Sequence, residues 1–323
     1  MQVSIIIPTY NRNNDLKNCL DSIFFQTVLP LEIIVIDNAN NLDTKKLVYK
    51  EGSKFREKQI HFEYIKNGES NSATIARNIG SRYSSGNFLL FLDDDVILEN
   101  NFIECILNVF VKYPNALGVQ GYIINKNINR MYDYIRSVFF LSHSQKNFNK
   151  LLPSMQDVHA YPLTKIVNCQ WLMSGCTCYR KEIIQRFKFD ENLYKYCSGD
   201  DADLSYRIYK EHPNTLYQTP FARLIHKNSD DGRAPKKEVI FTSQVYHTYL
   251  FYKDIPQNYS NKLIFVWSRF GYIITKILVS ILKPSKNNFL TIYYLLNAYL
   301  FCFQNLKALK RGELDFYTKN LWS

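Results

Sequence analysis

The sequence lacks several patterns that define common protein classes. It has 7 cysteines in 323 residues but no CxxC pair and no His/Cys spacing typical of zinc, so we expect reduced thiols and no zinc site. Its N-terminus, MQVSIIIPTYNR, has no basic segment followed by a long apolar run and a cleavage site, so we predict no secretory signal peptide. We find no nucleic-acid-binding module and expect no nucleic-acid partner. With 46% hydrophobic and 21% charged residues, the chain is neither disordered nor fibrous.

Basic and aromatic residues, by contrast, are abundant. The chain has 40 Lys and Arg against 29 Asp and Glu, a net charge of +11, and 15% aromatic residues. Most of the excess lies in residues 227–323, which have 14 basic and 6 acidic side chains. A balance of this kind favours an anionic partner, and its place beside aromatic segments favours an anionic membrane surface over nucleic acid.

The first 120 residues alternate short apolar runs with segments of helical period. The expected elements are, in chain order, 3–7, 13–25, 32–36, 61–65, 72–83, 88–92 and 101–112. Strands that alternate with helices imply right-handed crossovers and a mostly parallel sheet covered on both faces, which is an α/β fold. Ligands of such sheets bind beyond the carboxyl ends of the strands, so the polar residues after each strand are the first site candidates.

Regularity is lost over residues 125–165, and a long irregular insertion favours a functional loop or lid. Order returns after it, with elements expected at 166–179, 201–211, 216–218, 222–226 and 236–256. Two apolar, aromatic-rich segments follow within 262–310.

Three aspartates follow the expected strand at 88–92. A buried strand that delivers Asp93, Asp94 and Asp95 together brings like charges close, which raises their pKa values unless a cation lies among them. Oxygen ligands of this kind suit magnesium or manganese, which keep positions open for substrate phosphates. The alternative is a surface turn with helix-capping aspartates. The position of the run in a βα series favours the metal site.

Five segments, in the right order and spacing, resemble family 2 glycosyltransferases with the GT-A fold. They are IIIPTYNR at the start, LEIIVIDN at 31–38, ATIARNIG at 73–80, NFLLFLDDDV at 87–96 and SGDDADLSYRI at 198–208. The resemblance implies a Rossmann-like GT-A catalytic domain at 1–235, made of a nucleotide-binding half at 1–120, the insertion at 125–165 and an acceptor half at 166–235. Residues 236–323 are expected to form a C-terminal helical region that associates with a membrane.

The first of these segments are expected to hold a nucleotide. Backbone groups and the Tyr10 ring in the loop of Pro8, Thr9, Tyr10 and Asn11 are available to a base and ribose. Asp37 is expected to accept a hydrogen bond from the ring N–H of uracil or thymine, unless it only caps a helix. Arg77 and Asn78 lie on a helix that would face the same cleft, where an arginine suits pyrophosphate oxygens; the alternative is a solvated Arg77.

The aspartate run matches the family's DXD motif through Asp93 and Asp95. The resemblance implies that Asp95 is a metal ligand and that Asp93 contacts the ribose or metal-bound water. Asp94 fills the variable middle position and is grouped with the nucleotide-binding residues without a chemical role. His226 ends a late strand, where similar enzymes sometimes supply a third metal ligand, although a lone histidine is more often structural. The expected cofactor is a divalent cation, manganese or magnesium.

A second acidic cluster, Asp200, Asp201 and Asp203, begins the expected helix at 201–211. An inverting transfer needs a carboxylate that takes the proton from the attacking hydroxyl. Similar enzymes read Gly-Glu-Asp here, which implies Asp201 as general base, but Asp200 stands where Glu is usual, so the choice stays open. Asp203 ranks third and is placed in the donor or acceptor pocket. The structural interpretation is a first turn favoured by the helix dipole.

The segment before this cluster resembles the family's lining of the donor sugar and acceptor. Trp171 is expected to stack on the apolar face of a sugar, unless it is a core tryptophan. Ser174 and Gly175 belong to the same expected pocket. Arg233 is expected to close on the diphosphate from a later loop.

Four cations recur at intervals of seven in the first apolar C-terminal segment. Lys262, Arg269, Lys276 and Lys283 would form one stripe on a helix, because each interval drifts by only ~20°. We predict a helix in the membrane interface with these cations toward anionic headgroups. The segment 289–303 is expected to be a second interfacial or re-entrant helix, or a homo-oligomer contact. The alternative is that both helices only pack on the catalytic domain.

Together, these expectations describe a metal-dependent inverting glycosyltransferase, peripheral on the cytoplasmic face of a bacterial membrane. It would move a sugar from a nucleotide-diphosphate donor, with UDP or dTDP favoured, to a hydroxyl of a lipid-linked or cell-envelope saccharide. One alternative is a nucleotidyltransferase, which would have a Gly-rich, basic loop where this chain reads PTYNRNND. The other is an inactive scaffold that binds a nucleotide sugar and a membrane, which the intact Asp95 and Asp201 argue against.

Overall fold

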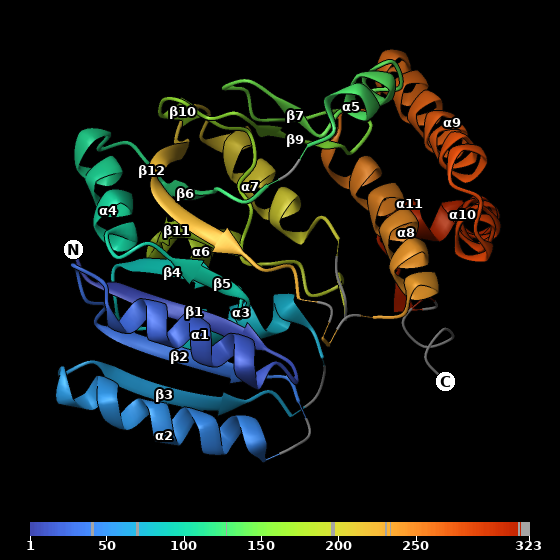
Figure 1. Ribbon diagram of the computed structural model, residues 1–323. Helices are drawn as coiled ribbons and strands as arrows, with labels where there is room; N and C mark the ends of the chain where they lie inside the picture. The colour runs from blue at the N-terminus through green and yellow to red at the C-terminus, as the bar shows by residue number, and fades with distance from the viewer. Residues whose placement is uncertain are drawn as a thin grey trace.

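The chain folds as a sheet flanked by helices, with a group of C-terminal helices beside it (Figure 1). The computed structural model describes residues 1–39, 42–68, 71–126, 128–194, 198–229, 231–232, 234–315 and 317. Within these residues the main sheet has the strand order β10-β12-β6-β11-β4-β1-β2-β3, and β5 pairs with β12. The α/β class predicted from the sequence is confirmed.

The N-terminal half of the sheet is parallel. Its strands are β1 (Val3–Thr9), β2 (Glu32–Asp37), β3 (His61–Lys66) and β4 (Phe88–Leu92). β1 pairs in parallel with β2 and β4, and β2 pairs with β3. Nearly every residue of β1, β2 and β4 is buried, because both sheet faces are covered, and this explains their continuous apolar runs. Their carboxyl ends therefore meet at one edge of the sheet.

Alternate strand residues enter two different cores. One core includes Ile5 of β1 and packs on α1 (Asn13–Phe24), α2 (Asp43–Glu57) and α4 (Phe102–Lys112). The other includes Ile6 and packs on α3 (Ala73–Tyr83), α6 (Lys181–Phe187) and α7 (Asp200–Glu211). α3 approaches the sheet so closely that a Cβ on Gly80 would lie 2.5 Å from a side-chain carbon of Ile6.

The other half of the sheet mixes strand directions. β11 (Cys176–Arg180) is antiparallel to β4 and to β6 (Gly118–Ile123), and β12 (Leu216–His226) is parallel to β6. β10 (Val167–Asn168) and β5 (Val96–Leu98) add to β12 in antiparallel fashion. The strands expected at 216–218 and 222–226 are one strand, which passes Pro220 with a shift in register. His226 pairs with Val96, and this register places it beside Asp95.

The insertion at 125–165 contains short regular elements. α5 (Arg130–Ser137) precedes a separate three-stranded sheet of β7 (Ser144–Gln145), β8 (Lys150–Leu151) and β9 (Asp157–Ala160). Strands this short show no sequence period, which is why the sequence predicted only an irregular segment.

The C-terminal region is helical, as predicted. Its helices are α8 (Lys236–Asp254), α9 (Tyr259–Leu282), α10 (Lys286–Gln304) and α11 (Leu306–Arg311). A third core cluster contains Tyr246, Leu250 and Phe265 from this region together with Trp171 and Leu193 from the preceding part. The helices are thus joined to the rest of the chain by a common core.

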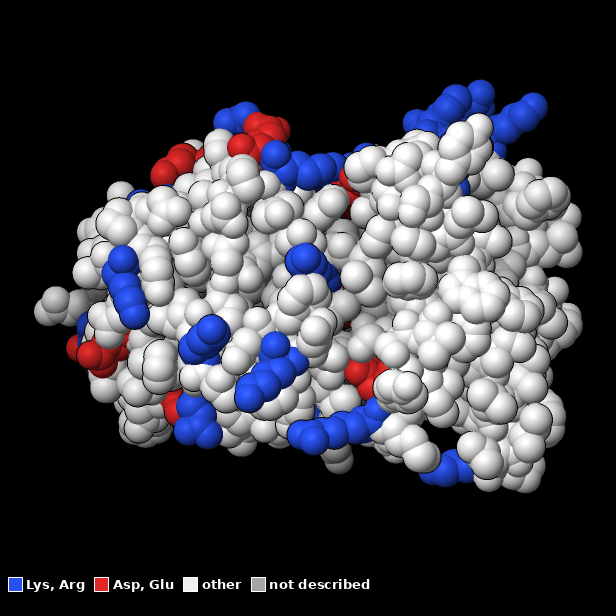
Figure 2. All heavy atoms as spheres, turned by 90° about the horizontal axis from the view of Figure 1, so that it is seen from above, with Lys and Arg blue, Asp and Glu red and all other residues white. Residues whose placement is uncertain are grey.

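The outward side of α9 is apolar. By length and composition α9 is the one helix of the described chain that could cross a membrane, and 28% of its most apolar window is buried. Leu263, Val266, Phe270 and Leu282 are among its exposed side chains. Figure 2 shows that the middle of the surface on the right, over the C-terminal helices, is free of charged side chains, and that basic side chains lie at its edges.

The cations of α9 do not form the predicted exposed stripe. Lys262 and Lys283, near the helix ends, are exposed. Arg269 instead donates hydrogen bonds inside the protein, to the carbonyl of Ser154 at 2.6 Å and to Oε1 of Gln244 at 3.1 Å. Lys276 lines an internal cavity. The prediction of a headgroup-facing stripe is therefore wrong for Arg269 and Lys276, because the 20° drift per heptad does not say which side of the helix faces the protein.

Candidate active site

A cavity of about 620 Å³, the main cleft, lies at the carboxyl ends of β1 and β4. The predicted site residues in its lining are Pro8, Thr9, Tyr10, Arg77, Asp93, Asp94, Asp95, Ser174, Gly175, Asp200, Asp201 and His226. Lining residues that the sequence did not single out include Arg12, Asn71, Met173 and Glu238. Parallel strand ends thus bring most of the predicted residues to one place.

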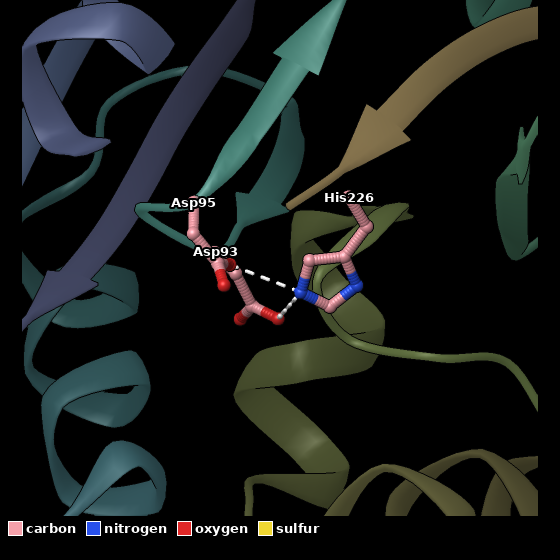
Figure 3. A group of neighbouring side chains, drawn as sticks. All are labelled: Asp93, Asp95 and His226. Atoms are coloured by element: carbon pink, nitrogen blue, oxygen red, sulfur yellow. Dashed lines mark ion pairs between the residues drawn. The ribbon is translucent and has the colours of Figure 1, made fainter. Parts of the chain in front are cut away.

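Asp93, Asp95 and His226 form an acidic cluster in this cleft (Figure 3). One ligand atom from each residue lies within 4.8 Å of the others. Nε2 of His226 is 3.0 Å from Oδ1 of Asp95 and 3.9 Å from Oδ2 of Asp93. Burial acts to raise the pKa of Asp95, but His226 and the Ser229 N–H outweigh burial and lower it. Asp95 is therefore ionised at neutral pH.

The donor atoms of this cluster fit a divalent cation. Two carboxylates and an imidazole suit manganese, and the carboxylates also suit magnesium. Asp93 keeps about a third of its side chain exposed toward the cleft, at 30%, whereas Asp95 has 3% exposed. A cation held here would therefore be accessible to a ligand from the side of Asp93.

Asp94 connects this cluster to the loop after β1. Its oxygens accept hydrogen bonds from Oγ1 of Thr9 at 2.7 Å and from Nη1 of Arg12 at 3.1 Å, and burial raises the pKa of Asp94 to about 7. Arg12 also donates to the carbonyls of Ser229 and Asp231, so it joins three loops. The only sequence signal for Arg12 is its place at the end of IIIPTYNR.

Arg77 joins the two acidic clusters. It is buried, and it donates to Oδ2 of Asp200 at 2.6 Å and to Oδ1 of Asp93 at 3.0 Å. Asn78 points elsewhere, because its amide donates to the Phe189 carbonyl and to Glu191. Arg77 thus fixes the position of Asp93 relative to the start of α7.

The carboxylates of Asp200 and Asp201 have different environments. The charge of Asp200 is paired with Arg77, whereas the Asp201 carboxylate accepts a hydrogen bond only from the adjacent Ala202 N–H, at 2.8 Å, among the hydrogen bonds described. Burial, followed by the charges of Asp200 and Asp157, raises the pKa of Asp201. Asp201 borders the main cleft and also a second cavity.

Gly175 and Ser174 form the floor of the cleft next to Asp93. A Cβ on Gly175 would lie 2.2 Å from Oδ2 of Asp93, so a side chain here would displace that carboxylate. The Asp93 N–H donates to the Gly175 carbonyl at 3.2 Å. Ser174 Oγ is buried without a hydrogen-bond partner among the described residues, which makes it available to a ligand.

Two residues predicted to line the donor or acceptor pocket are buried and have structural roles instead. Trp171 is 1% exposed and its indole N–H donates to the Val158 carbonyl, so it is a core tryptophan and the predicted sugar stacking is wrong. Asp203 is fully buried and pairs with Arg207 at 2.8 Å and with Lys253 at 2.6 Å. It anchors α7 to α8, and its placement in the pocket is also wrong, because the helix turns it away from the cleft.

Two further predicted residues lie outside the cleft lining, and a third is not among the described residues. Asp37 is fully buried, and its oxygens accept from the Ala39 N–H and the Tyr64 hydroxyl, each at 2.8 Å, so the predicted contact to a pyrimidine ring is not supported. Its neighbour Asn38 lines the cleft instead. Asn11 is exposed and is not part of the lining. Arg233 lies outside the described residues.

Comparison with known proteins places the chain in a family. The family described as Glycosyl transferase family 2 matches residues 4–186. Glycosyltransferase GlyA of Streptococcus pneumoniae serotype 4 is 25% identical over 233 residues, which are 71% of this chain and 31% of GlyA. The Escherichia coli protein WfgD, a UDP-Glc:alpha-D-GlcNAc-diphosphoundecaprenol beta-1,3-glucosyltransferase, is 34% identical over 126 residues, or 39% of this chain and 47% of WfgD. The chain thus matches less than half the length of either relative.

A solved structure shares the fold. The mannosyltransferase PcManGT of Pyrobaculum calidifontis, in complex with GDP-Man and Mn²⁺, superposes with a TM-score of 0.58 at 14% identity, over 99% of this chain and 87% of that one. Because the family match covers more than half of the chain, this chain belongs to glycosyl transferase family 2, and it has the GT-A fold.

Proposed function

We propose that this chain is a metal-dependent inverting glycosyltransferase that uses a nucleotide-diphosphate sugar. The observation that carries the proposal is one cleft with a cluster that could hold a cation, Asp93, Asp95 and His226, and a carboxylate with a raised pKa, Asp201, which has no ion pair among the described residues. The Mn²⁺ and GDP-Man bound by the mannosyltransferase of similar fold support it.

Asp93, Asp95 and His226 would hold the cation. When bound there, a divalent cation neutralises the negative charge that develops on the departing nucleoside diphosphate. Arg77 keeps Asp93 in place through their 3.0 Å hydrogen bond. The imidazole in this ligand set favours manganese over magnesium.

Asp201 is the general base. The acceptor oxygen forms a bond to the anomeric carbon while the bond from that carbon to the diphosphate oxygen breaks, and Asp201 takes the hydroxyl proton. A group poised near neutral pKa suits this task better than Asp200, whose charge is neutralised by Arg77. Attack opposite the leaving group inverts the configuration at the anomeric carbon.

The donor is a UDP- or dTDP-sugar, and its nucleotide lies along Pro8, Thr9, Tyr10 and Asn38. The acceptor is a lipid-linked or cell-envelope saccharide, which the diphosphoundecaprenol acceptor in the name of WfgD supports. We place the enzyme on the cytoplasmic membrane face, resting on the apolar outward side of α9 and α10. Family membership argues against the nucleotidyltransferase. If the protein is instead an inactive scaffold, it should bind a nucleotide sugar without transferring the sugar.

A thermal-shift screen of nucleotide sugars, in Mn²⁺ and in EDTA, tests the donor site. At a hundredfold excess over Kd, a UDP- or dTDP-sugar should raise Tm by about 5 °C in Mn²⁺ only. Asp95→Asn should remove this shift. Lys227→Gln, which alters a surface ion pair with Asp15, should keep it. An equal shift in EDTA would contradict the metal site, and no shift with any nucleotide sugar would contradict the proposed function.

A further inference from the structure

A second cavity, of about 340 Å³, lies beneath α9; we call it the α9 cavity. Its walls come from the segment after α5, the start of α7, and the inner sides of α8 and α9. Within the described chain, Asp201 is the single residue that borders both this cavity and the main cleft. A molecule in the α9 cavity therefore reaches Asp201 from the side away from the nucleotide.

Three cations line the α9 cavity, namely Arg136, Arg269 and Lys276. Arg136 lies near the end of α5, whereas the other two lie seven residues apart on α9. The guanidinium of Arg136 lies 5.9 Å and Nζ of Lys276 lies 5.0 Å from the centre of the Tyr272 ring, so the two cations flank one aromatic side chain. Charges from different segments thus gather in one place.

In the described residues, none of these three cations pairs with a carboxylate. Arg136 donates to the Leu141 carbonyl and to Oε1 of Gln156, and Arg269 donates to the Ser154 carbonyl and to Gln244. Burial lowers the pKa of the Arg269 guanidinium, and no acid nearby offsets this. A buried cation without a counter-charge is unfavourable, and an anionic ligand would relieve that cost.

The other titratable groups leave the cavity with a basic end. Burial lowers the pKa of His143 to about 4 and that of His247 to about 3, so both rings are neutral. The two acids in the lining are Asp157 and Asp201, and the charge of Asp157 contributes to the raised pKa of Asp201, so these two lie near one another. The α9 side of the cavity therefore carries two cations, Arg269 and Lys276, while the charge of Arg136 also acts on Asp157.

We propose that the α9 cavity binds the acceptor as a phosphorylated saccharide, with its phosphate on Arg136, Arg269 and Lys276 and its attacking hydroxyl at Asp201. This rests on the proposed function, because it takes Asp201 as the base. Phosphate is the anion that matches several converging Arg and Lys donors. The phosphate belongs either to a lipid-linked saccharide or to a phosphodiester in a glycan.

The surroundings of the cavity suit a lipid-linked acceptor. α9 carries the cations on its inner side and exposes Leu263, Val266 and Phe270 on its outer side. The indole N–H of Trp267 donates to the Val138 carbonyl at 2.9 Å, which ties α9 to the segment after α5 above the cavity. A lipid chain leaving the basic end would find apolar surface on α9.

The test compares two pairs of cations on α9 and its C-cap residue, Lys283. Arg269→Gln with Lys276→Gln removes the charges in the cavity, whereas Lys262→Gln with Lys283→Gln removes the two exposed ones. Calorimetry without vesicles measures binding of decyl diphosphate, glycerophosphoglycerol and neutral decanol. EDTA keeps metal-bound phosphate out of the main cleft. At least one phosphorylated probe should bind more tightly than decanol, and the cavity pair should weaken it tenfold or more while the exposed pair leaves it unchanged.

Lys276→Gln alone guards against misfolding, because among the described residues its side chain has no hydrogen bond or ion pair and lies over the Tyr272 ring, and it should weaken the same probe severalfold. Binding of UDP and of dTDP with Mn²⁺ is measured on every variant. A wild type that binds neither UDP nor dTDP with Mn²⁺ contradicts the proposed function. A wild type that binds either nucleotide but prefers neither phosphorylated probe to decanol, or a cavity pair that binds like wild type, overturns the inference. Preference for decyl diphosphate identifies a lipid-linked source, and preference for glycerophosphoglycerol identifies a phosphodiester.

Discussion

The main cleft and the α9 cavity share Asp201 but balance their charges differently. In the cleft Arg77 pairs with Asp93 and Arg12 pairs with Asp94, and Nε2 of His226 lies 3.0 Å from Oδ1 of Asp95. Beneath α9, three cations face neutral groups. In the proposed function the cleft holds a cation and a nucleotide, whereas the cavity is proposed to hold an anion. Asp201 lies where the two meet.

The largest effect is expected from removing that shared carboxylate. Asp201→Asn should reduce kcat by about 10³-fold, because general-base catalysis contributes 10²–10⁴-fold, while the Kd for UDP with Mn²⁺ changes little. Steady-state kinetics and calorimetry give both numbers.

Asp203→Asn is the matched control, because Asp203 lies on the same helix and pairs with Arg207 and Lys253. It should lower the free energy of unfolding by about 3 kcal/mol and leave kcat of the folded enzyme close to wild type. If Asp201→Asn retains transfer, the base assignment fails. If wild type binds nucleotide sugars but transfers to no acceptor and does not hydrolyse them, the inactive scaffold is the better description.

A smaller effect is a pH dependence of kcat/KM, of about tenfold per pH unit, which follows from the environment of Asp201. Burial and the neighbouring acids raise its pKa, and a base acts only when ionised. kcat/KM should therefore rise with pH through a pKa above the ~4 of an ordinary carboxylate. Stability has the opposite sign, because the folded chain binds this proton more tightly than the unfolded chain, so Tm should fall over the same range. Asp201→Asn should show a weaker fall; an unchanged fall would contradict the raised pKa.

The smallest effect concerns the outer surface of α9. Phe270→Ser and Leu282→Ser should each weaken binding to lipid vesicles about threefold to tenfold, since both side chains are exposed and would enter the bilayer. Phe25→Ser, an exposed phenylalanine beside α1, is the control and should change nothing. Cosedimentation with neutral and anionic vesicles measures this. A loss of binding restricted to anionic vesicles would favour attraction to anionic headgroups. No loss of binding would favour helices that only pack on the catalytic domain.

The parts of the site that depend on parallel strands were predictable from the sequence. Asp93 and Asp95 follow a continuous apolar run, and the loop after β1 ends at the same sheet edge, so both were placed correctly. His226 was harder, because it reaches Asp95 only through the pairing of β12 with β5, a strand of three residues.

The features that depend on helix rotation and packing were not predictable. Trp171 and Asp203 have types that suit a sugar pocket, but the third core cluster and Lys253 hold them inside. Arg269 and Lys276 have a spacing that suits a membrane helix, but the sequence does not record which side of α9 packs on the insertion. The α9 cavity therefore became visible only when residues from four segments were placed together.

At Gly271, α9 crosses the segment after α5 so closely that a Cβ would lie 2.1 Å from the Phe139 ring. Because Gly271 has no side chain, α9 and the segment after α5 can approach this closely where both border the α9 cavity. Gly271→Ala would push the segment after α5 away from α9 without replacing any charged or apolar surface residue. The absence of a side chain at Gly271 thus determines how closely α9, whose outer side is apolar, approaches a wall of the cavity that Asp201 borders.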